Sequence, residues 1–326
     1  MLALSSLPCL PEAVSTPVGA EVYRGLTSNP KKLSPWLFYD QRGSELFEAI
    51  TDLPEYYLTR TERDLFAQYG DEILAAAADH SDLSILELGA GTAAKTGLLL
   101  EAAVRRLGSV TYYPIDISAS ALEAAGRRIA EQFPRVTVES RVADYTRSLA
   151  DIPAPGCRRL VLYIGSSIGN FEPSDAAALL RDLRRQLNPG DLLLLGVDHV
   201  KDRGTLLHAY NDSAGVTADF NRNILFRINR DLGARFRPRL FRHRAIWNER
   251  EGRIEMHLES LVAQEVAIPS LGLNVMFRRG ESIHTESSYK FTPDSVSRLL
   301  ERAGLVPRHN WTDNRHWFGV YLAEAA

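Results

Sequence analysis

The chain has 326 residues, of which 45% are hydrophobic and 24% charged, and its formal net charge is −3. This composition is typical of a globular protein with one large or two ordinary domains, and it excludes a disordered chain. The acidic balance gives no electrostatic footprint for nucleic acid, and no apolar run reaches the length of a membrane span. We expect no nucleic-acid partner, no membrane association and a monomer.

The cysteine and histidine content indicates a cytoplasmic protein without a metal. Cys9 and Cys157 are far apart and lack metal-ligand spacing, which fits a reducing compartment. The eight histidines form no HExxH motif or other close ligand pair, so a zinc site has no support. The N-terminus lacks the basic and apolar regions of a secretory signal.

The first distinctive stretch is DLPEYYLTRTE, residues 52–62, which places Tyr56 and Tyr57 between a proline and a helical-looking run. On its own this junction predicts a packed turn, in which the rings cover apolar surface and the hydroxyls reach water. The alternative is that one of the tyrosines binds a ligand.

A glycine-rich turn follows in SILELGAGTAAKTGLLL, which begins at Ser84. Ile85, Leu86 and Leu88 predict a strand buried on both faces, and a helix is expected to begin near Thr92. Such a turn lets the backbone approach a ligand closely and directs helix N–H groups at it. The G-x-G-x-x-A pattern alone is also typical of dinucleotide dehydrogenases.

Four further strands are predicted, and the first two of them end on acidic residues. The stretch 110–118 ends near Asp116, which is placed to accept hydrogen bonds from two ribose hydroxyls. The stretch 136–145 ends on Asp144 and Tyr145, where a carboxylate and a ring can hold an adenine. The other two strands are residues 159–171, which break at Gly165 ahead of Asn170, and residues 190–198. Five buried strands alternating with helices predict a mostly parallel sheet covered on both faces.

Residues 201–289 are too long for a crossover connection and predict an inserted domain. Residues 207–232 are expected to be mainly helical, and three extended stretches follow. In residues 253–263 apolar and polar side chains alternate, which predicts a half-buried strand containing Met256. In residues 284–291 the same period places His284, Glu286 and Ser288 on one face.

The C-terminal residues 290–325 predict a capped helix followed by two strands joined by a short loop. Thr292 is a good N-cap and Pro293 suits the first helical position. A terminal hairpin added to a doubly wound sheet resembles the way S-adenosylmethionine-dependent methyltransferases complete their fold. The predicted fold is therefore α/β: a Rossmann-like class I methyltransferase sheet with a C-terminal antiparallel hairpin, plus an α+β substrate-binding domain. The predicted methyltransferase domain is residues 63–200 and 290–326, and the predicted substrate-binding domain is residues 1–62 and 201–289.

Taken together, the motifs resemble those of the histidine Nα-methyltransferases of ergothioneine biosynthesis over nearly the full chain. The matching stretches are FYDQRGSELFEAITDLPEYYLTRTE, ELGAGTAAKT, YYPIDIS, YIGSSIGNF, AYNDSAGVTADFNRN, IEMHL and TESSYKF. The resemblance implies three successive methyl transfers from S-adenosyl-L-methionine to the α-amino nitrogen of free L-histidine, through the mono- and dimethylated forms, giving hercynine. Ala90 departs from the serine expected there, which should leave the chemistry unchanged.

The resemblance also implies a role for individual residues. The methyl donor would be held by Gly89, Lys95, Asp116, Asp144 and Tyr145. The backbone groups of histidine would be held by Tyr56, Asn170 and Tyr210. Glu286 and Ser288 would bind the imidazole, against which Met256 would pack. Tyr39 and Phe47 would line the place where donor and acceptor meet, and Tyr39 and Asn170 are the candidates for orienting the amine.

Three other functions share parts of this pattern. An N-methyltransferase for another amino acid or amine, such as tryptophan, would have the same donor site, so only the pocket around Met256, Glu286 and Ser288 separates it. A carboxylate beside the substrate ring favours imidazole over indole. An RNA methyltransferase is disfavoured by the acidic balance, and a nicotinamide-dependent dehydrogenase by the C-terminal hairpin.

Overall fold

The computed structural model describes the chain except residues 1–11, 79–81, 92, 94, 151 and 154. Two compact units are formed, each from two separate stretches of sequence. Unit 1 is Met1–Tyr56 with Asp202–Ser288, and unit 2 is Tyr57–Lys201 with Tyr289–Ala326. The first break therefore falls between Tyr56 and Tyr57, six residues earlier than the boundary at 62/63 in the sequence prediction.

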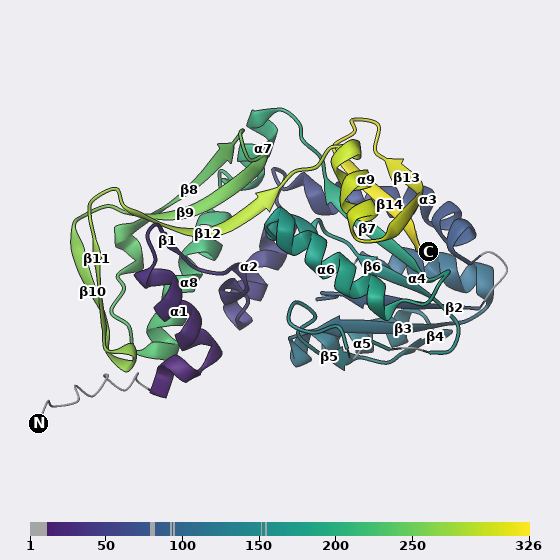
Figure 1. The fold of residues 1–326 in the computed structure, drawn as a ribbon, viewed down its shortest axis with the longest axis horizontal. Helices are drawn as coiled ribbons and strands as arrows, with labels where there is room; N and C mark the ends of the chain where they lie inside the picture. Colours follow the sequence, from purple (N-terminus) through teal and green to yellow (C-terminus); the bar gives the residue numbers. More distant parts are fainter. Residues whose placement is uncertain (1–11, 79–81, 92, 94, 151, 154) are drawn as a thin grey trace, which may run out of the picture. The chain divides into compact units, whose positions relative to one another are not determined.

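Within the described residues, unit 2 contains an eight-stranded sheet in the order β13-β14-β7-β6-β2-β3-β4, with β5 also paired to β3 (Figure 1). The strands are β2 (Leu83–Leu88), β3 (Val110–Asp116), β4 (Val136–Val138), β5 (Arg141–Val142), β6 (Arg158–Tyr163), β7 (Leu192–Asp198), β13 (Leu305–Thr312) and β14 (Phe318–Ala325). The central pairs β2/β3, β2/β6 and β6/β7 are parallel, whereas β14 is antiparallel to both β7 and β13. The predicted parallel sheet with an antiparallel C-terminal hairpin is confirmed.

Helices bury both faces of this sheet. They are α3 (Tyr57–Ala78), α4 (Thr96–Leu107), α5 (Ala119–Gln132), η3 (Ser167–Asn170), α6 (Pro173–Gln186) and α9 (Pro293–Arg302). Ile85 packs in a core with residues of α3, α4 and α5, whereas its neighbour Leu86 packs in a core with residues of α6 and α9. Successive strand residues point to opposite faces, so a strand covered on both sides carries apolar side chains on both of them. Thr292 caps α9 as predicted, and Pro293 is its first residue.

Unit 1 combines helices with a four-stranded sheet and a separate two-stranded one. Its helical elements are η1 (Glu12–Ser15), α1 (Pro17–Thr27), η2 (Pro35–Phe38), α2 (Gln41–Thr51), α7 (Arg203–Ala209), α8 (Val216–Leu232), η4 (Pro238–Leu240) and η5 (Pro269–Leu271). Its strands are β1 (Lys31–Lys32), β8 (Phe241–Asn248), β9 (Arg253–Ser260), β10 (Gln264–Ile268), β11 (Leu273–Phe277) and β12 (Ser282–Tyr289). The larger sheet has the order β1-β12-β9-β8. Because Lys31 pairs with Ile283, the N-terminal stretch and the inserted stretch share this sheet.

Several predicted elements differ in detail from the observed ones. The expected strand over 136–145 is two short strands, β4 and β5, and the insertion contains five strands where three extended stretches were expected. Helix α4 begins at Thr96 rather than near Thr92, a residue that lies outside the described ones. Each difference concerns element ends and short edge strands, whose pairing depends on neighbours that the sequence pattern does not specify.

The prediction that the Tyr57 ring is packed is confirmed, but the prediction that its hydroxyl reaches water is wrong. Tyr57 is the first residue of α3 and is buried, and its hydroxyl lies 2.8 Å from Asp198 Oδ2 and 2.6 Å from Lys201 Nζ. Lys290 Nζ lies 2.8 Å from the same carboxylate, and Asp198 and Lys290 have fully buried side chains. Burial lowers the pKa of the Lys201 ammonium to about 8. The tyrosine therefore belongs to a buried polar cluster of unit 2, in which its hydroxyl helps to satisfy a carboxylate removed from water.

Among the residues that the structure describes, none of the helices combines the length and the apolar character that a membrane span requires.

Candidate functional site

The glycine turn lies at the carboxyl end of β2 and needs its glycines. Gly89 and Gly91 have φ of +70° and +51°, in the left-handed region that side chains with a Cβ rarely adopt. The N–H of Gly89 donates to the carbonyl of Ile115 at 2.8 Å, which binds the turn to β3. A Cβ added to Gly89 would stand 2.9 Å from the Tyr145 hydroxyl. The turn thus brings bare backbone against one of the predicted donor-binding side chains.

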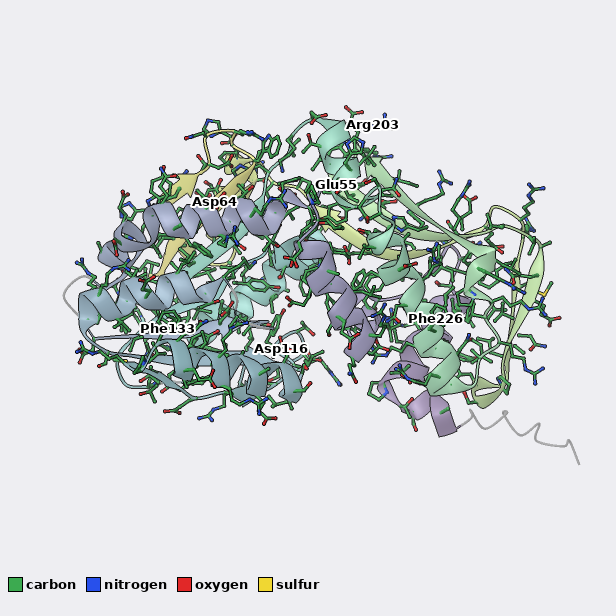
Figure 2. The ribbon with its side chains drawn as sticks, turned by 180° about the vertical axis from the view of Figure 1, so that it is seen from behind. Glu55, Asp64, Asp116, Phe133, Arg203 and Phe226 are labelled. Atoms are coloured by element: carbon green, nitrogen blue, oxygen red, sulfur yellow. The ribbon has the colours of Figure 1, made fainter. Side chains whose placement is uncertain are left out.

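Asp116 is the last residue of β3, as predicted, and its carboxylate organises the same edge of the sheet. It accepts a hydrogen bond from Gly91 N at 3.0 Å and one from Ser118 N at 2.9 Å. The side chain is half-buried and is labelled in Figure 2. A carboxylate has about four acceptor positions, so two remain for the hydroxyls of a ribose. These two hydrogen bonds hold the carboxylate in place and leave acceptor positions for a ligand.

We expect Asp116→Ala to weaken binding of S-adenosylmethionine by about 1.5–3 kcal/mol, the range for lost charged hydrogen bonds. Calorimetric titration with S-adenosylhomocysteine measures this loss. Glu139→Ala, which removes an exposed carboxylate from the segment after β4, is the control and should bind as the parent does. Unchanged affinity in Asp116→Ala would remove this residue from the donor site.

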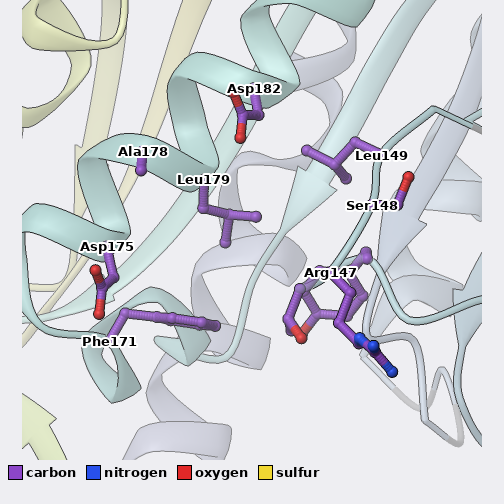
Figure 3. Close-up of a pocket in the computed structure, with 10 residues that line it drawn as sticks. Arg147, Ser148, Leu149, Phe171, Asp175, Ala178, Leu179 and Asp182 are labelled. Carbon is purple, nitrogen blue, oxygen red and sulfur yellow. The ribbon is translucent and has the colours of Figure 1, made fainter.

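Asp144 and Tyr145 follow β5, beside a cavity of about 360 Å³ in unit 2 (Figure 3). The lining residues are Tyr145, Thr146, Arg147, Ser148, Leu149, Phe171, Asp175, Ala178, Leu179 and Asp182. The Asp144 carboxylate is exposed and accepts a hydrogen bond from the Thr146 hydroxyl at 2.6 Å. Burial raises the pKa of the Tyr145 phenol to about 12, so its hydroxyl keeps its proton at neutral pH. Polar and apolar side chains share this lining, of which Asp144 is not a part, and the aromatic rings of Tyr145 and Phe171 offer surfaces against which a flat ring such as adenine can pack.

Lys95 is held by a buried partner that the sequence analysis did not select. Its ammonium forms an ion pair with Glu62, which is fully buried on α3 and also accepts a hydrogen bond from Gly165 N at 2.8 Å. A Cβ on Gly196 would stand 2.2 Å from the same carboxylate, so glycine there leaves room for Glu62. Glu62 is the last residue of the DLPEYYLTRTE stretch. Only the tyrosines of that stretch were considered from the sequence, although an acidic residue within it could have been selected as well. Lys95 is fixed rather than a freely exposed helix residue.

A second buried acid, Glu87, is the last residue but one of β2. It accepts hydrogen bonds from the hydroxyls of Thr96, at 2.6 Å, and Tyr112. Burial raises the pKa of its carboxyl from 4.5 to about 7. Because the folded state holds this proton more tightly than the unfolded state, the stabilisation is complete below pH 4.5 and is lost as pH rises through 7.

We expect Glu87→Gln to gain stability relative to the parent as the pH rises, because glutamine keeps the size and an acceptor oxygen but does not ionise. The gain between pH 6 and pH 8 should be about 1 kcal/mol from the linkage of these two pKa values. Urea unfolding of both proteins at the two pH values measures it. If the difference in stability between the two proteins is the same at both pH values, Glu87 does not take up a proton in this range.

In unit 1 the predicted histidine-binding tyrosines form a connected aromatic group. The ring centroids of Tyr39 and Phe47 are 5.8 Å apart, those of Phe47 and Tyr56 are 6.3 Å apart, and those of Tyr56 and Tyr210 are 6.3 Å apart. The Tyr210 hydroxyl and Ser288 Oγ are 2.8 Å apart. Residues from four separate stretches of sequence therefore meet in one unit.

Glu286, Ser288 and Met256 lie on adjacent strands of the same sheet. Glu286 and Ser288 belong to β12, which is next to the β9 strand that carries Met256. All three are buried, and Glu286 is 9% exposed. A carboxylate is rarely buried without a polar partner, so Glu286 is not the solvated surface charge that the sequence left open. Asn170 lies in unit 2, half-buried at the end of η3.

One group of unit 1 side chains has the chemistry of metal ligands, which sequence spacing did not indicate. Among the described residues, ligand atoms of Glu255, His257 and His284 lie within 4.8 Å of one another. The two imidazole rings are stacked, with centroids 4.9 Å and planes 24° apart, so their in-plane lone pairs do not converge on one point. Burial acts to raise the pKa of Glu255, but hydrogen bonds from Asn248 and Arg253 lower it to about 2. The arrangement fits a hydrogen-bonded cluster better than a metal centre.

Comparison with known proteins identifies the family. Residues 18–325 match the family described as histidine-specific methyltransferase, SAM-dependent. The chain belongs to this family.

Named relatives agree with the family assignment. The histidine N-alpha-methyltransferase of Mycolicibacterium smegmatis is 46% identical over 303 residues, which cover 93% of each chain. That of Mycobacterium tuberculosis is 44% identical over 304 residues, again 93% of each chain. The ergothioneine biosynthesis protein 1 of Neurospora crassa is 32% identical over 90% of this chain, which matches 33% of that longer protein. A SAM-dependent N-methyltransferase activity follows for this member of the histidine-specific methyltransferases.

Proposed function

We propose that this protein transfers three methyl groups in succession from S-adenosylmethionine to the α-amino nitrogen of free L-histidine, giving hercynine for ergothioneine biosynthesis. Unit 2 binds the donor, through the glycine turn, Lys95, Asp116, Asp144 and Tyr145. Unit 1 binds histidine, through the tyrosine group, Met256, Glu286 and Ser288. Tyr39 and Asn170 are the candidates for orienting the amine. The observation that carries the proposal is the buried carboxylate of Glu286, two residues before the Ser288 hydroxyl that pairs with Tyr210.

Methyl transfer requires that the substrate nitrogen be aligned with the donor methyl group and that this nitrogen have a free lone pair. The nitrogen attacks the donor methyl carbon, the carbon–sulfur bond breaks with its electrons going to sulfur, and a neutral thioether leaves. Histidine arrives mostly as an ammonium, so its amine must lose a proton before the first transfer, and the methylated amine loses one before each of the next two. Burial and a neighbouring sulfonium both favour that loss. Alignment of the reacting atoms can lower the barrier by about 7–11 kcal/mol in well-oriented cases.

Glu286 and Ser288 favour imidazole as the substrate ring. Imidazole offers N–H donors and can carry a positive charge, and a carboxylate satisfies both properties. An indole has one N–H and a large apolar surface, so it offers the carboxylate of Glu286 fewer donors and no positive charge. The same comparison applies to phenylalanine, which offers no ring donor.

The test is a competition assay with histidine, tryptophan and phenylalanine at equal concentrations and limiting S-adenosylmethionine. We expect products of histidine carrying one, two and three methyl groups, identified by mass spectrometry with the methyls on the α-nitrogen. If tryptophan is methylated in preference to histidine, tryptophan and not histidine is the substrate. Methylation of a ring nitrogen of histidine would contradict the proposed orientation.

A further inference from the structure

A buried chain of side-chain hydrogen bonds in unit 1 joins the segments that carry the proposed histidine ligands. His243 Nε2 lies 2.8 Å from the carbonyl oxygen of Tyr210, and His243 Nδ1 lies 2.8 Å from Asn221 Nδ2. The Thr285 hydroxyl donates to Asn221 Oδ1 at 2.8 Å. His243 is 7% exposed, and Asn221 and Thr285 are fully buried. None of the linking side chains has a role in the methyl transfer described above.

The position of each proton in this chain follows from two carbonyl groups. The Tyr210 carbonyl only accepts, so His243 Nε2 must carry its proton. Asn221 Nδ2 also lies 3.1 Å from the carbonyl of His257, which requires the amide nitrogen, and not its oxygen, to be on that side. The amide therefore donates to His243 Nδ1, which accepts as the bare nitrogen of a neutral ring. The amide oxygen is left to accept from Thr285.

The surroundings of His243 keep its ring neutral. Burial lowers its pKa, and the positive charge of Arg222 acts in the same direction. The hydrogen bond to the Tyr210 carbonyl and the carboxylate of Asp212 act in the opposite direction but do not outweigh them. A second proton on the ring would place an N–H against the N–H of Asn221, so the neutral form is also the one that the hydrogen bonds require.

One amide thereby ties helix α8 to the three strands β8, β9 and β12. Asn221 lies on α8 and reaches the β9 carbonyl of His257, while Thr285 on β12 also lies 3.0 Å from the β9 carbonyl of Met256. Through His243 on β8, the amide also holds Tyr210 at the end of α7. Thr285 is the neighbour of Glu286. Each of these connections therefore ends at, or next to, a residue that is assigned above to bind histidine.

We propose that Asn221 and His243 are positioning residues for the histidine substrate, which set the spacing of Tyr210, Met256 and Glu286 without touching the ligand. The inference rests on the proposed assignment of those three residues to histidine. Binding side chains must be held to within about 0.5 Å of their working geometry, and buried hydrogen bonds of fixed direction achieve this. Because the donor is assigned to unit 2, loss of this network should affect histidine alone.

The test is Asn221→Asp, which keeps the shape of the side chain and removes both N–H donors. We expect the dissociation constant and KM for histidine to rise about tenfold or more, the loss typical of broken buried hydrogen bonds. Affinity for S-adenosylhomocysteine should change by less than about twofold. Asn229→Asp is the matched control, because Asn229 lies on the same helix and its side chain bonds to the backbone of Phe236 rather than to the segments assigned to histidine. It should leave the histidine KM unchanged.

Nitrogen NMR of the ¹⁵N-histidine-labelled protein supplies a readout that a general loss of stability would not move. The His243 ring of the parent should show a protonated Nε2 and a bare Nδ1, and in Asn221→Asp it should acquire a proton on Nδ1. Thr285→Val, which removes the hydroxyl from the other end of the chain, serves if Asn221→Asp does not fold. It should raise the histidine KM in the same way.

The outcomes separate this inference from the proposed function. If the parent methylates histidine and Asn221→Asp matches Asn229→Asp in its histidine KM, the positioning role is wrong and the proposed function stands. Equal losses of histidine and donor affinity would also overturn it. If the parent does not methylate histidine at all, the proposed function is wrong, and the positioning role that rests on it is wrong as well.

Discussion

Glu286→Leu is expected to lower kcat/KM for histidine by about tenfold to a hundredfold or more, the range for a lost charged hydrogen bond. The leucine removes both the acceptor and the charge from a side chain that is 9% exposed on β12. Donor affinity should hardly change, because Glu286 lies in unit 1 and the donor residues in unit 2. The variant should also discriminate less between histidine and apolar aromatic amino acids, since it lacks the carboxylate that an imidazole N–H would reach and an apolar ring would not.

Two further variants separate the charge of Glu286 from its shape and from general effects. Glu286→Gln keeps the size and an acceptor oxygen, so it should lie between the parent and Glu286→Leu. Glu259→Gln changes a carboxylate of the same sheet that pairs with Arg242 and Arg244, and it should leave the choice of substrate unchanged. If Glu286→Leu methylates histidine as well as the parent does, the carboxylate does not recognise the ring, and the main support for the choice of histidine is lost.

Asp191→Ala is expected to destabilise the protein by about 3–5 kcal/mol, the cost of leaving one member of a buried ion pair alone. Arg159 is 2% exposed, and its Nε donates to Asp191 Oδ2 at 2.7 Å. The same carboxylate accepts from the backbone N–H groups of Arg159 and Asn188, both at 2.8 Å. The alanine thus removes the charge partner of the arginine and the acceptor for the turn before β7. Urea unfolding measures the loss.

The control is Glu123→Ala, which removes an exposed carboxylate from its pair with Arg127 on α5 and should cost less than about 1 kcal/mol. Combining Asp191→Leu with Arg159→Leu should recover part of the loss, because an apolar pair leaves no buried charge without a partner. A cost for Asp191→Ala no greater than that of Glu123→Ala would mean that water reaches Arg159 and replaces the carboxylate.

The sequence by itself determined those features that depend on a residue and its near neighbours along the chain. The apolar residues Ile85, Leu86 and Leu88 of β2 predict a strand with helices on both faces, because consecutive side chains point to opposite sides. Gly89 marks a turn and Pro293 a helix start through backbone conformation, and Thr292 marks the same helix start through its capping side chain. Asp116 ends its strand as expected, and at the carboxyl edge of a parallel sheet that position predicts a ligand contact before any neighbour is known.

Only the tertiary structure decided which side chains distant in sequence meet and which charges are buried. Glu62 and Lys95 pair across 33 positions, and Tyr57 reaches Asp198 across 141. Asn221 is an ordinary helix residue by pattern, yet its amide joins a histidine 22 positions away to a threonine 64 positions away. A buried polar group must find a partner wherever the fold brings one, and hydrophobic periodicity carries no information about which partner that is.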